Sequence, residues 1–314
     1  MHCVLIYNPA SGRERFRRAG QIQEVSDLLS ALGHRVDVMA TTAPGSATLQ
    51  ARDAAANGTN ILFACGGDGT VHEVIQGLVS ETVPARTILG ILPFGSANAL
   101  ARNLQISLDP TIAARQLIQG RVHTIPVGKL VHGADVRYFA VMAGAGPDGA
   151  LAYEVLGAHK SNLGRLAYYL HSARLFFTRR FRPFEVEYTL TASGNVETRR
   201  AVCVMAVRLG DLGGLFGRLT DSQASADDTH LRLLILGPPA AISLPLWFLS
   251  GWLNLHSLNP FLRFADVSGF HCGCGLEAAP HIQADGEWIG HAPMQVSLVP
   301  NALRLLVPSQ DQGS

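Results

Sequence analysis

The sequence predicts an α/β domain with a parallel sheet, followed by a mainly antiparallel β-sandwich domain. Short apolar runs alternate with helix-like segments over the first 120 or so residues, which is typical of strand-helix units in a parallel sheet. Long β-branched runs with a period of two begin at about residue 122 and predict antiparallel strands. A chain of 314 residues also exceeds what one hydrophobic core usually serves, which favours two domains.

In the first domain, each predicted strand leads into a predicted helix. The strand-like runs are CVLIYN (3–8), HRVDVMA (34–40), NILFAC (60–65) and TILGIL (87–92). Helices are expected over 16–32 and 47–56, and from about residues 70 and 97 onward. Ligands of such sheets bind beyond the carboxyl ends of the strands, so the loops that follow the strands are the candidate binding loops.

The second domain is predicted from β-rich runs joined by turns. These runs are FEVEYTLTA (184–192), VETRRAVCVMAV (196–207), HLRLLIL (230–236), FADVSGFHCGC (264–274), HIQADGEWIG (281–290) and MQVSLV (294–299). One helix is expected between Leu166 and Phe177, where apolar residues recur at spacings of three and four. The predicted boundaries are 1–125 for the first domain, with 300–314 packing back on it, and 126–299 for the second.

Composition excludes several classes of protein. The net charge of +1 lacks the Lys/Arg excess of a long phosphate footprint, so no nucleic-acid partner is expected. The five cysteines are odd in number and lie mostly in apolar runs, which indicates reduced thiols in the cytoplasm. No secretory signal is recognised, and the most apolar stretch, 240–255, is interrupted by Pro245 and Gly251 and is too short to span a bilayer. A soluble protein is therefore expected.

Three loops rich in small residues follow predicted strands and open predicted helices. They are NPASGRER (8–15), GGDGT (66–70) and PFGSANALAR (93–102). Backbone N–H groups at helix N-termini bind anions, so three such loops at one sheet edge favour a nucleotide phosphate as ligand. Tight turns and caps explain any one of the loops equally well. No P-loop pattern occurs, and the G-x-G-x-x-G at 144–149 lies outside the strand-helix-strand unit that a dinucleotide site requires.

Five motifs in this order resemble the diacylglycerol kinase catalytic-domain family, which includes bacterial lipid kinases, sphingosine kinases and ceramide kinases. They are NPASG, GGDGTVHEV, PFGSANALAR, GAGPDG and ADGE, and the resemblance runs from about residue 3 to 308. It implies a Rossmann-like ATP-binding domain, similar to NAD kinases and phosphofructokinases, and a β-sandwich domain for the lipid. It also implies ATP and Mg²⁺ as cofactors, a lipid hydroxyl as phosphoryl acceptor, such as that of diacylglycerol or a sphingoid base, and action from the cytoplasm at the inner membrane surface.

The same resemblance implies roles for the loops of the first domain. Asp68 would lie near the phosphates or the acceptor hydroxyl, Thr70 would cap the following helix, and Glu73 would point back to the loop. A solvated helix face explains His72 as well as any role does. Arg13 or Arg15 could meet phosphate oxygens. The implied nucleotide-binding residues are Asn8, Ser11, Gly12, Gly66, Gly67, Gly69, Thr70, Gly95, Ser96 and Asn98.

In the second domain, the resemblance makes Asp285 the general base, with Glu287 assisting through Mg²⁺ or orientation. In the sphingosine kinase branch the base is instead the aspartate of GGDG, here Asp68, and the sequence leaves this choice open. Asp148 would hold the polar head of the acceptor, and Glu287 and Asp228 would bind metal. Phosphoryl transfer requires a carboxylate to receive the hydroxyl proton. The Asp285-Gly286 pair is also a strong type I′ hairpin signal.

Two departures from the family pattern keep alternatives open. Ala99 stands where the diacylglycerol kinase branch usually has aspartate, and Thr229 replaces the glycine of an Asp-Asp-Gly motif near a structural Mg²⁺. The alternatives are an NAD kinase-like enzyme and a non-catalytic nucleotide-binding regulatory protein. A homodimer also stays open. Trp247, Phe248 and Trp252, or the segment 176–184, are candidates for peripheral membrane contact, although core burial explains most of these side chains.

Overall fold

The computed structural model describes residues 1–9, 11, 17–79, 86–157, 180–210, 224–253, 255–273 and 279–309. The chain divides into two compact units, of which the first is Met1–Val127 with Pro300–Ser314 and the second is Gly128–Val299. Strands β5 (Arg121–His132) and β15 (Met294–Val307) contain the two points at which the chain passes between the units.

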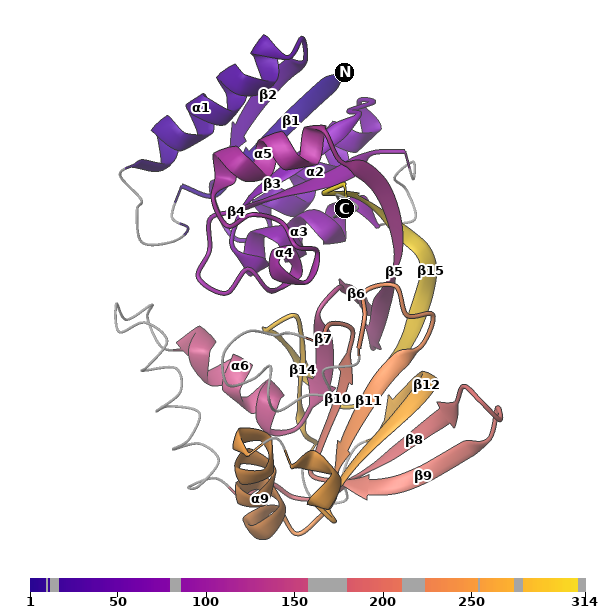
Figure 1. Cartoon of the computed structure of the whole chain (residues 1–314). Coiled ribbons are helices and arrows are strands. Elements are labelled where there is room, and N and C mark those ends of the chain that lie inside the picture. Colours follow the sequence, from indigo (N-terminus) through magenta and orange to yellow (C-terminus); the bar gives the residue numbers. More distant parts are fainter. Residues whose placement is uncertain are drawn as a thin grey trace. The chain divides into compact units, whose positions relative to one another are not determined.

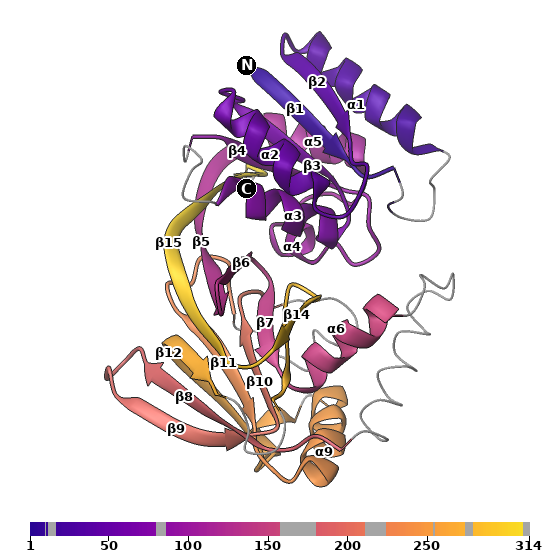
Figure 2. The same cartoon turned by 180° about the vertical axis from the view of Figure 1, so that it is seen from behind.

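The first unit is a parallel sheet with helices on both faces. Its strand order is β2-β1-β3-β4-β15, and every pair in this series is parallel. Helices α1 and α5 pack together over one face, whereas α2 and α3 pack together over the other (Figures 1 and 2). The bounds are β1 (His2–Tyr7), α1 (Arg18–Ala31), β2 (Arg35–Ala40), α2 (Ser46–Ala56), β3 (Ile61–Gly66), α3 (Asp68–Leu78), β4 (Ile88–Pro93), α4 (Ala99–Asn103) and α5 (Pro110–Ile118).

Local sequence explains these elements. Every residue of β3 is buried, as a central strand covered on both faces requires, and this accounts for its unbroken apolar run. Helix α5 begins with Pro110 after Asp109, whose carboxylate accepts hydrogen bonds from the backbone N–H groups of Thr111 and Ile112. The C-terminal strand enters this sheet beside β4, where Leu305 pairs with Leu89.

The second unit is built from antiparallel strands. Alternate side chains from its strands meet in one buried core that includes Phe139, Phe184 and Phe270. Helix α6 packs on β13 and β14, and α9 covers a second cluster on the other face of β10 and β11. The bounds are β6 (Asp135–Phe139), β7 (Met142–Ala145), α6 (Pro147–Gly157), β8 (Phe184–Leu190), β9 (Val196–Ala201), β10 (Cys203–Val207), β11 (Leu231–Leu236), α9 (Ala240–Trp252), η2 (His256–Leu258), β12 (Leu262–Cys272), β13 (His281–Ala284) and β14 (Glu287–His291).

The predicted fold class is confirmed: parallel strands with helices come first, and mainly antiparallel strands follow. The helix expected between Leu166 and Phe177 lies outside the described residues. In the part of the chain that the structure describes, no helix combines the length and hydropathy needed to cross a membrane.

Candidate active site

The loops that follow β3 and β4 pack backbone against backbone. A Cβ atom built on Gly95 would lie 2.5 Å from the Gly67 Cα, and one built on Gly67 would lie 3.2 Å from the Gly95 Cα. The backbone N–H of Phe94 donates to the carbonyl of Gly66 at 2.8 Å. Any side chain at Gly67 or Gly95 would therefore push the loops apart, so internal packing alone explains these two glycines.

Asp68 joins the same two loops through its carboxylate. Its oxygens accept hydrogen bonds from the backbone N–H groups of Asn98 at 2.9 Å and Ala99 at 2.7 Å, at the start of α4. Asn98 has a φ of +50°, and its side-chain amide bonds both the N–H and the carbonyl of Gly95. These contacts give Asp68 a positioning role in the loop after β4, and its role as a proton acceptor stays a prediction.

Gly69 differs from the other glycines of its loop. It is exposed in the first turn of α3, and a Cβ atom built on it would meet no atom within 4 Å. A Cβ atom on Gly66, in contrast, would overlap the Thr70 side chain. Packing within the chain therefore does not require glycine at position 69, and the open backbone at a helix N-terminus suits an anionic group.

The loop after β1 reaches the same edge of the sheet. The Asn8 N–H donates to the carbonyl of Cys65 at 3.2 Å, and the Ser11 N–H donates to the carbonyl of Asn8 at 3.1 Å. The Arg18 guanidinium donates to the carbonyl of Ser11 at 2.6 Å and lies 4.1 Å from the centre of the Phe94 ring. All three predicted loops thus meet within the first unit.

Sequence reasoning missed Arg18, which is 4% exposed. The signal was present, because Arg18 occupies the first position of the buried stripe of α1, followed by Ile22, Val25 and Leu29. An arginine at a core-facing helix position, next to a loop of small residues, indicates that its guanidinium binds backbone groups of that loop.

Two expectations for α3, those for Thr70 and Glu73, are wrong, and the structure excludes the solvated-face alternative for His72. Thr70 does not cap the helix, because α3 begins at Asp68 with Gly67 at the N-cap position. Glu73 does not point back to the GGDG loop; its carboxylate accepts from the Ala47 N–H at 3.1 Å, in the first turn of α2. His72 does not lie on a solvated face, since it is 2% exposed and its ring contacts the Gln76 amide at 3.4 Å. Helical spacing predicts which side chains share a face of α3, but it does not predict which element packs against that face.

Other nucleotide-site candidates are placed only in part. Ser96 is exposed in the loop after β4. Gly12, Arg13 and Arg15 lie outside the described residues, so their predicted contacts with phosphate are not described.

In the second unit, Asp285 occupies the turn between β13 and β14. Asp285 has a φ of +48° and Gly286 a φ of +84°, as a type I′ hairpin requires. The Asp285 carboxylate accepts hydrogen bonds from the N–H groups of Ala140, Val141 and Met142, each at 2.9 Å. This carboxylate therefore holds the connection between β6 and β7, while the general-base role stays a prediction.

Asp148 lies in the first turn of α6 and is linked to the same hairpin. Its carboxylate accepts from the Gln283 side-chain amide at 3.0 Å, and the Gln283 side-chain carbonyl accepts from the Gly286 N–H at 2.9 Å. Burial raises the pKa of Asp148 to about 6, and the hydrogen bond from Gln283 offsets part of this rise. Asp148 is thus a carboxyl group whose pKa lies well above its ordinary value, because it is buried.

In the described part of the chain no group of three or more His, Cys, Asp and Glu side chains gathers, so the metal roles of Asp228 and Glu287 stay predictions. The Asp228 carboxylate accepts from the Ser225 N–H at 2.8 Å. The buried Arg208 guanidinium binds the carbonyls of Ala226, Asp228 and His230. Burial lowers the pKa of Arg208 to about 10, so it stays charged at neutral pH. A cationic side chain therefore already engages these carbonyls, which does not fit a structural Mg²⁺ held by them.

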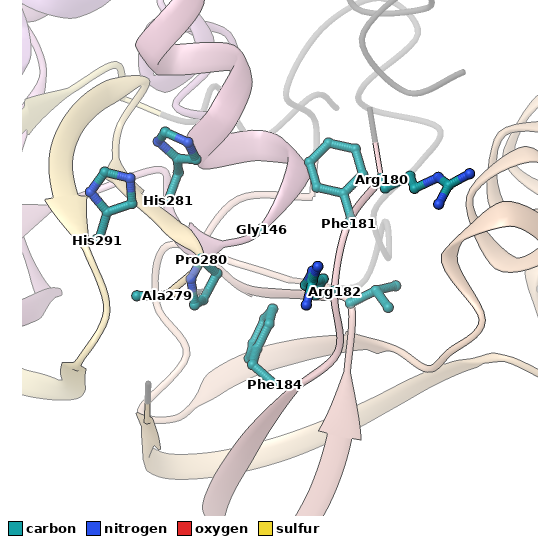
Figure 3. A pocket seen from close by; sticks show the side chains of 10 residues that line it. Gly146, Arg180, Phe181, Arg182, Phe184, Ala279, Pro280, His281 and His291 are labelled. Carbon is teal, nitrogen blue, oxygen red and sulfur yellow. The ribbon is translucent and has the colours of Figure 1, made fainter. Parts of the chain in front are cut away.

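A pocket of about 220 Å³ opens beside the start of α6 (Figure 3). Trp288 donates its indole N–H to His281 Nδ1 at 3.1 Å, so the proton of a neutral His281 ring sits on Nε2. The His281 and His291 ring centres are 4.3 Å apart. The lining residues combine basic groups with aromatic rings: Gly146, Arg180, Phe181, Arg182, Phe184, Val202, Ala279, Pro280, His281 and His291.

The sequence of this chain is similar to known proteins of one family. Residues 2–130 match the model of the diacylglycerol kinase catalytic domain. A diacylglycerol kinase of Bacillus subtilis (strain 168) is 34% identical over 233 residues, which cover 74% of this chain and 72% of the relative. A diacylglycerol kinase of Staphylococcus aureus (strain MRSA252) is 31% identical over 289 residues, covering 92% of this chain and 87% of the relative.

Solved structures share the fold. A crystal structure of a diacylglycerol kinase from Bacillus anthracis str. Sterne matches with a TM-score of 0.69 at 20% identity, over 98% of this chain and 96% of that one. A second crystal structure from the same strain reaches a TM-score of 0.74 at 22% identity, again over 98% and 96% of the two chains. At these identities the likeness establishes the fold alone.

Proposed function

Because this chain belongs to the diacylglycerol kinase catalytic-domain family, we propose that it transfers the γ-phosphoryl group of ATP to the hydroxyl group of a lipid. The observation that supports ATP binding most directly is the fused pair of loops after β3 and β4. Gly67 and Gly95 let these loops touch, Asp68 ties them to α4, and Gly69 leaves an open backbone beside them. Backbone amides and a helix N-terminus held in this way form a preorganised phosphate cradle.

In the proposed reaction, the lipid hydroxyl oxygen bonds to the γ-phosphorus, the bond from that phosphorus to the bridging oxygen breaks, and ADP leaves. The hydroxyl proton passes to a carboxylate, for which Asp68 and Asp285 are both candidates. Mg²⁺ bound to the phosphates would neutralise charge that develops on them. The contribution of this chain is to hold the phosphates with the N-terminus of α3, while Arg18 fixes the loop that starts at Asn8.

Diacylglycerol is the proposed acceptor, because both curated relatives described above are named diacylglycerol kinases. A sphingoid base is the second candidate, because Ala99 takes the place of the aspartate that the diacylglycerol kinase branch usually has.

The proposal is tested by incubating the purified chain with γ-labelled ATP and, separately, diacylglycerol, sphingosine, ceramide and NAD, with the lipids in detergent micelles. We expect label in phosphatidic acid. Label in NAD alone would favour the NAD kinase-like alternative, and ATP binding without transfer to any acceptor would favour a regulatory protein. The variant Gly69→Ala tests the nucleotide site, since the free chain has space for the added methyl group and any loss of transfer would therefore come from the bound nucleotide.

A further inference from the structure

Large apolar side chains are exposed on α9, on η2 and on the residues that join them. Trp252 is 66% exposed and Leu258 is 72% exposed. Residues 237–262, which contain both elements, include no Asp, Glu, Lys or Arg. Exposed apolar groups that gather on one segment mark a surface that contacts something other than water. We name this set the α9 surface: Ile242, Leu249, Trp252, Leu253, Leu255 and Leu258.

The α9 surface stands on a fixed support. Leu244 and Trp247, on the other side of the helix, are 1% and 2% exposed and pack in the cluster formed with β10 and β11. The Leu255 N–H donates to the carbonyl of Ser250 at 2.7 Å, and the Asn259 side chain donates to Ser250 Oγ at 3.3 Å. Since α9 is anchored in the core and the segment with η2 is tied to it, the exposed side chains of the α9 surface stand on a fixed backbone.

Two exposed arginines lie next to the core cluster that anchors α9. Arg180 and Arg182 flank Phe181 (Figure 3), and Phe181 packs against the same cluster as Leu244 and Trp247 of α9. An apolar surface without charged residues, with cationic side chains next to its supporting cluster, is complementary to a bilayer that carries anionic headgroups.

We propose that the α9 surface docks this protein on an anionic lipid bilayer. Trp252 and the leucines enter the boundary between headgroups and acyl chains, and the arginines face the phosphates. The proposal rests on the proposed function, because a kinase whose acceptor resides in a bilayer has to work at its surface. The proposal also assigns different roles to two tryptophans of α9: Trp247 packs in the core, and Trp252 anchors the protein in the membrane.

The test measures co-sedimentation of the full chain with vesicles of phosphatidylcholine and with vesicles of phosphatidylcholine mixed with phosphatidylglycerol. We expect the wild type to bind the mixed vesicles more tightly. The double variant Trp252→Ser/Leu258→Ser should weaken this binding about tenfold or more. The control Leu49→Ser removes a leucine that is 59% exposed on α2 and should bind as the wild type does. Arg180→Gln/Arg182→Gln should reduce binding to the mixed vesicles only, and increasingly so at low salt.

Three outcomes separate this proposal from its rivals. Unchanged vesicle binding by the double variant would overturn it. The wild type could fail to bind vesicles and sediment as a dimer, while the double variant sediments as a monomer. That result would assign the α9 surface to contact with a second copy of the chain. Vesicle binding that depends on the α9 surface, in a chain that phosphorylates no dispersed short-chain lipid, would support docking and count against the proposed function alone.

Discussion

Replacing Asp148 by asparagine should make the protein more stable above pH 6. In the unfolded chain this carboxyl ionises near its ordinary value of 3.8, whereas burial raises its pKa in the folded protein to about 6. A pKa difference of about two units corresponds to about 3 kcal/mol. Because Asp148 keeps some exposed surface, we take this value as an upper bound.

The sign of the effect follows from which state releases its proton first. Below about pH 4 both states hold the proton, and the residue has no net effect. Between about pH 4 and 6 the unfolded chain ionises more readily, so stability falls as pH rises, and above pH 6 the full cost is present. Asp148→Asn removes this cost, since a neutral amide has no charge to desolvate and its oxygen still accepts from Gln283. The carboxylate also accepts from the Gly149 N–H, and an amide cannot keep all of these bonds, which reduces the gain at every pH.

Urea unfolding of wild type and variant, followed by circular dichroism from pH 4 to 8, measures the difference. We expect equal stability near pH 4 and a gap that widens to at most about 3 kcal/mol at pH 8. Asp135→Asn, at an exposed position on β6, is the control and should show no such widening. A constant gap across this range, or a variant less stable at pH 8, would refute the reasoning. Lower catalytic activity together with higher stability would indicate that the carboxylate is retained for binding the acceptor.

Three further substitutions test the sites. Gly69→Ala should raise the free energy of unfolding by about 0.5–1 kcal/mol, because alanine favours the helix. The same variant should raise the KM for ATP at least about tenfold, because the methyl group keeps the phosphates from the backbone of α3. An unchanged KM would contradict a ligand at Gly69. Asp285→Asn should lower stability by about 2–4 kcal/mol in thermal or urea unfolding, because an amide cannot accept all three N–H groups; unaltered stability would mean that these bonds carry little weight. Arg18→Met keeps the side-chain volume but releases the Ser11 carbonyl, so ATP affinity measured by calorimetry should fall about tenfold, and equal affinity would separate Arg18 from the nucleotide site.

Sequence patterns predicted the local features of this chain well. The Asp285-Gly286 pair predicted a type I′ turn, and the positive φ angles of both residues confirm it, because the turn depends on neighbouring residues only. The same aspartate accepts a hydrogen bond from Ala140, which is 145 residues away along the chain. The pairing of β13 with β7 brings these two residues together. No local pattern contains that information. Arg18 and Glu73 show the same limit, since their partners belong to other elements.

The glycines of the GGDG loop show how one motif can contain two kinds of requirement. Gly66 and Gly67 are explained by Thr70 and Gly95, which leave no space for a side chain. Gly69 has that space. Composition alone treats the three alike, and only the surroundings of each Cα atom separate the residues needed for packing from the residue available to a ligand.

The contact between Gly67 and Gly95 has a mechanical consequence. The loops after β3 and β4 pack directly against each other at these glycines, and hydrogen bonds to Asp68 connect them. They therefore form one stiff body, so neither loop can fold down over a bound nucleotide while the other stays in place. Whatever opening and shutting accompanies turnover has to be carried by other segments of the chain. For protein engineering, the two turns are best treated as a single cassette and exchanged together.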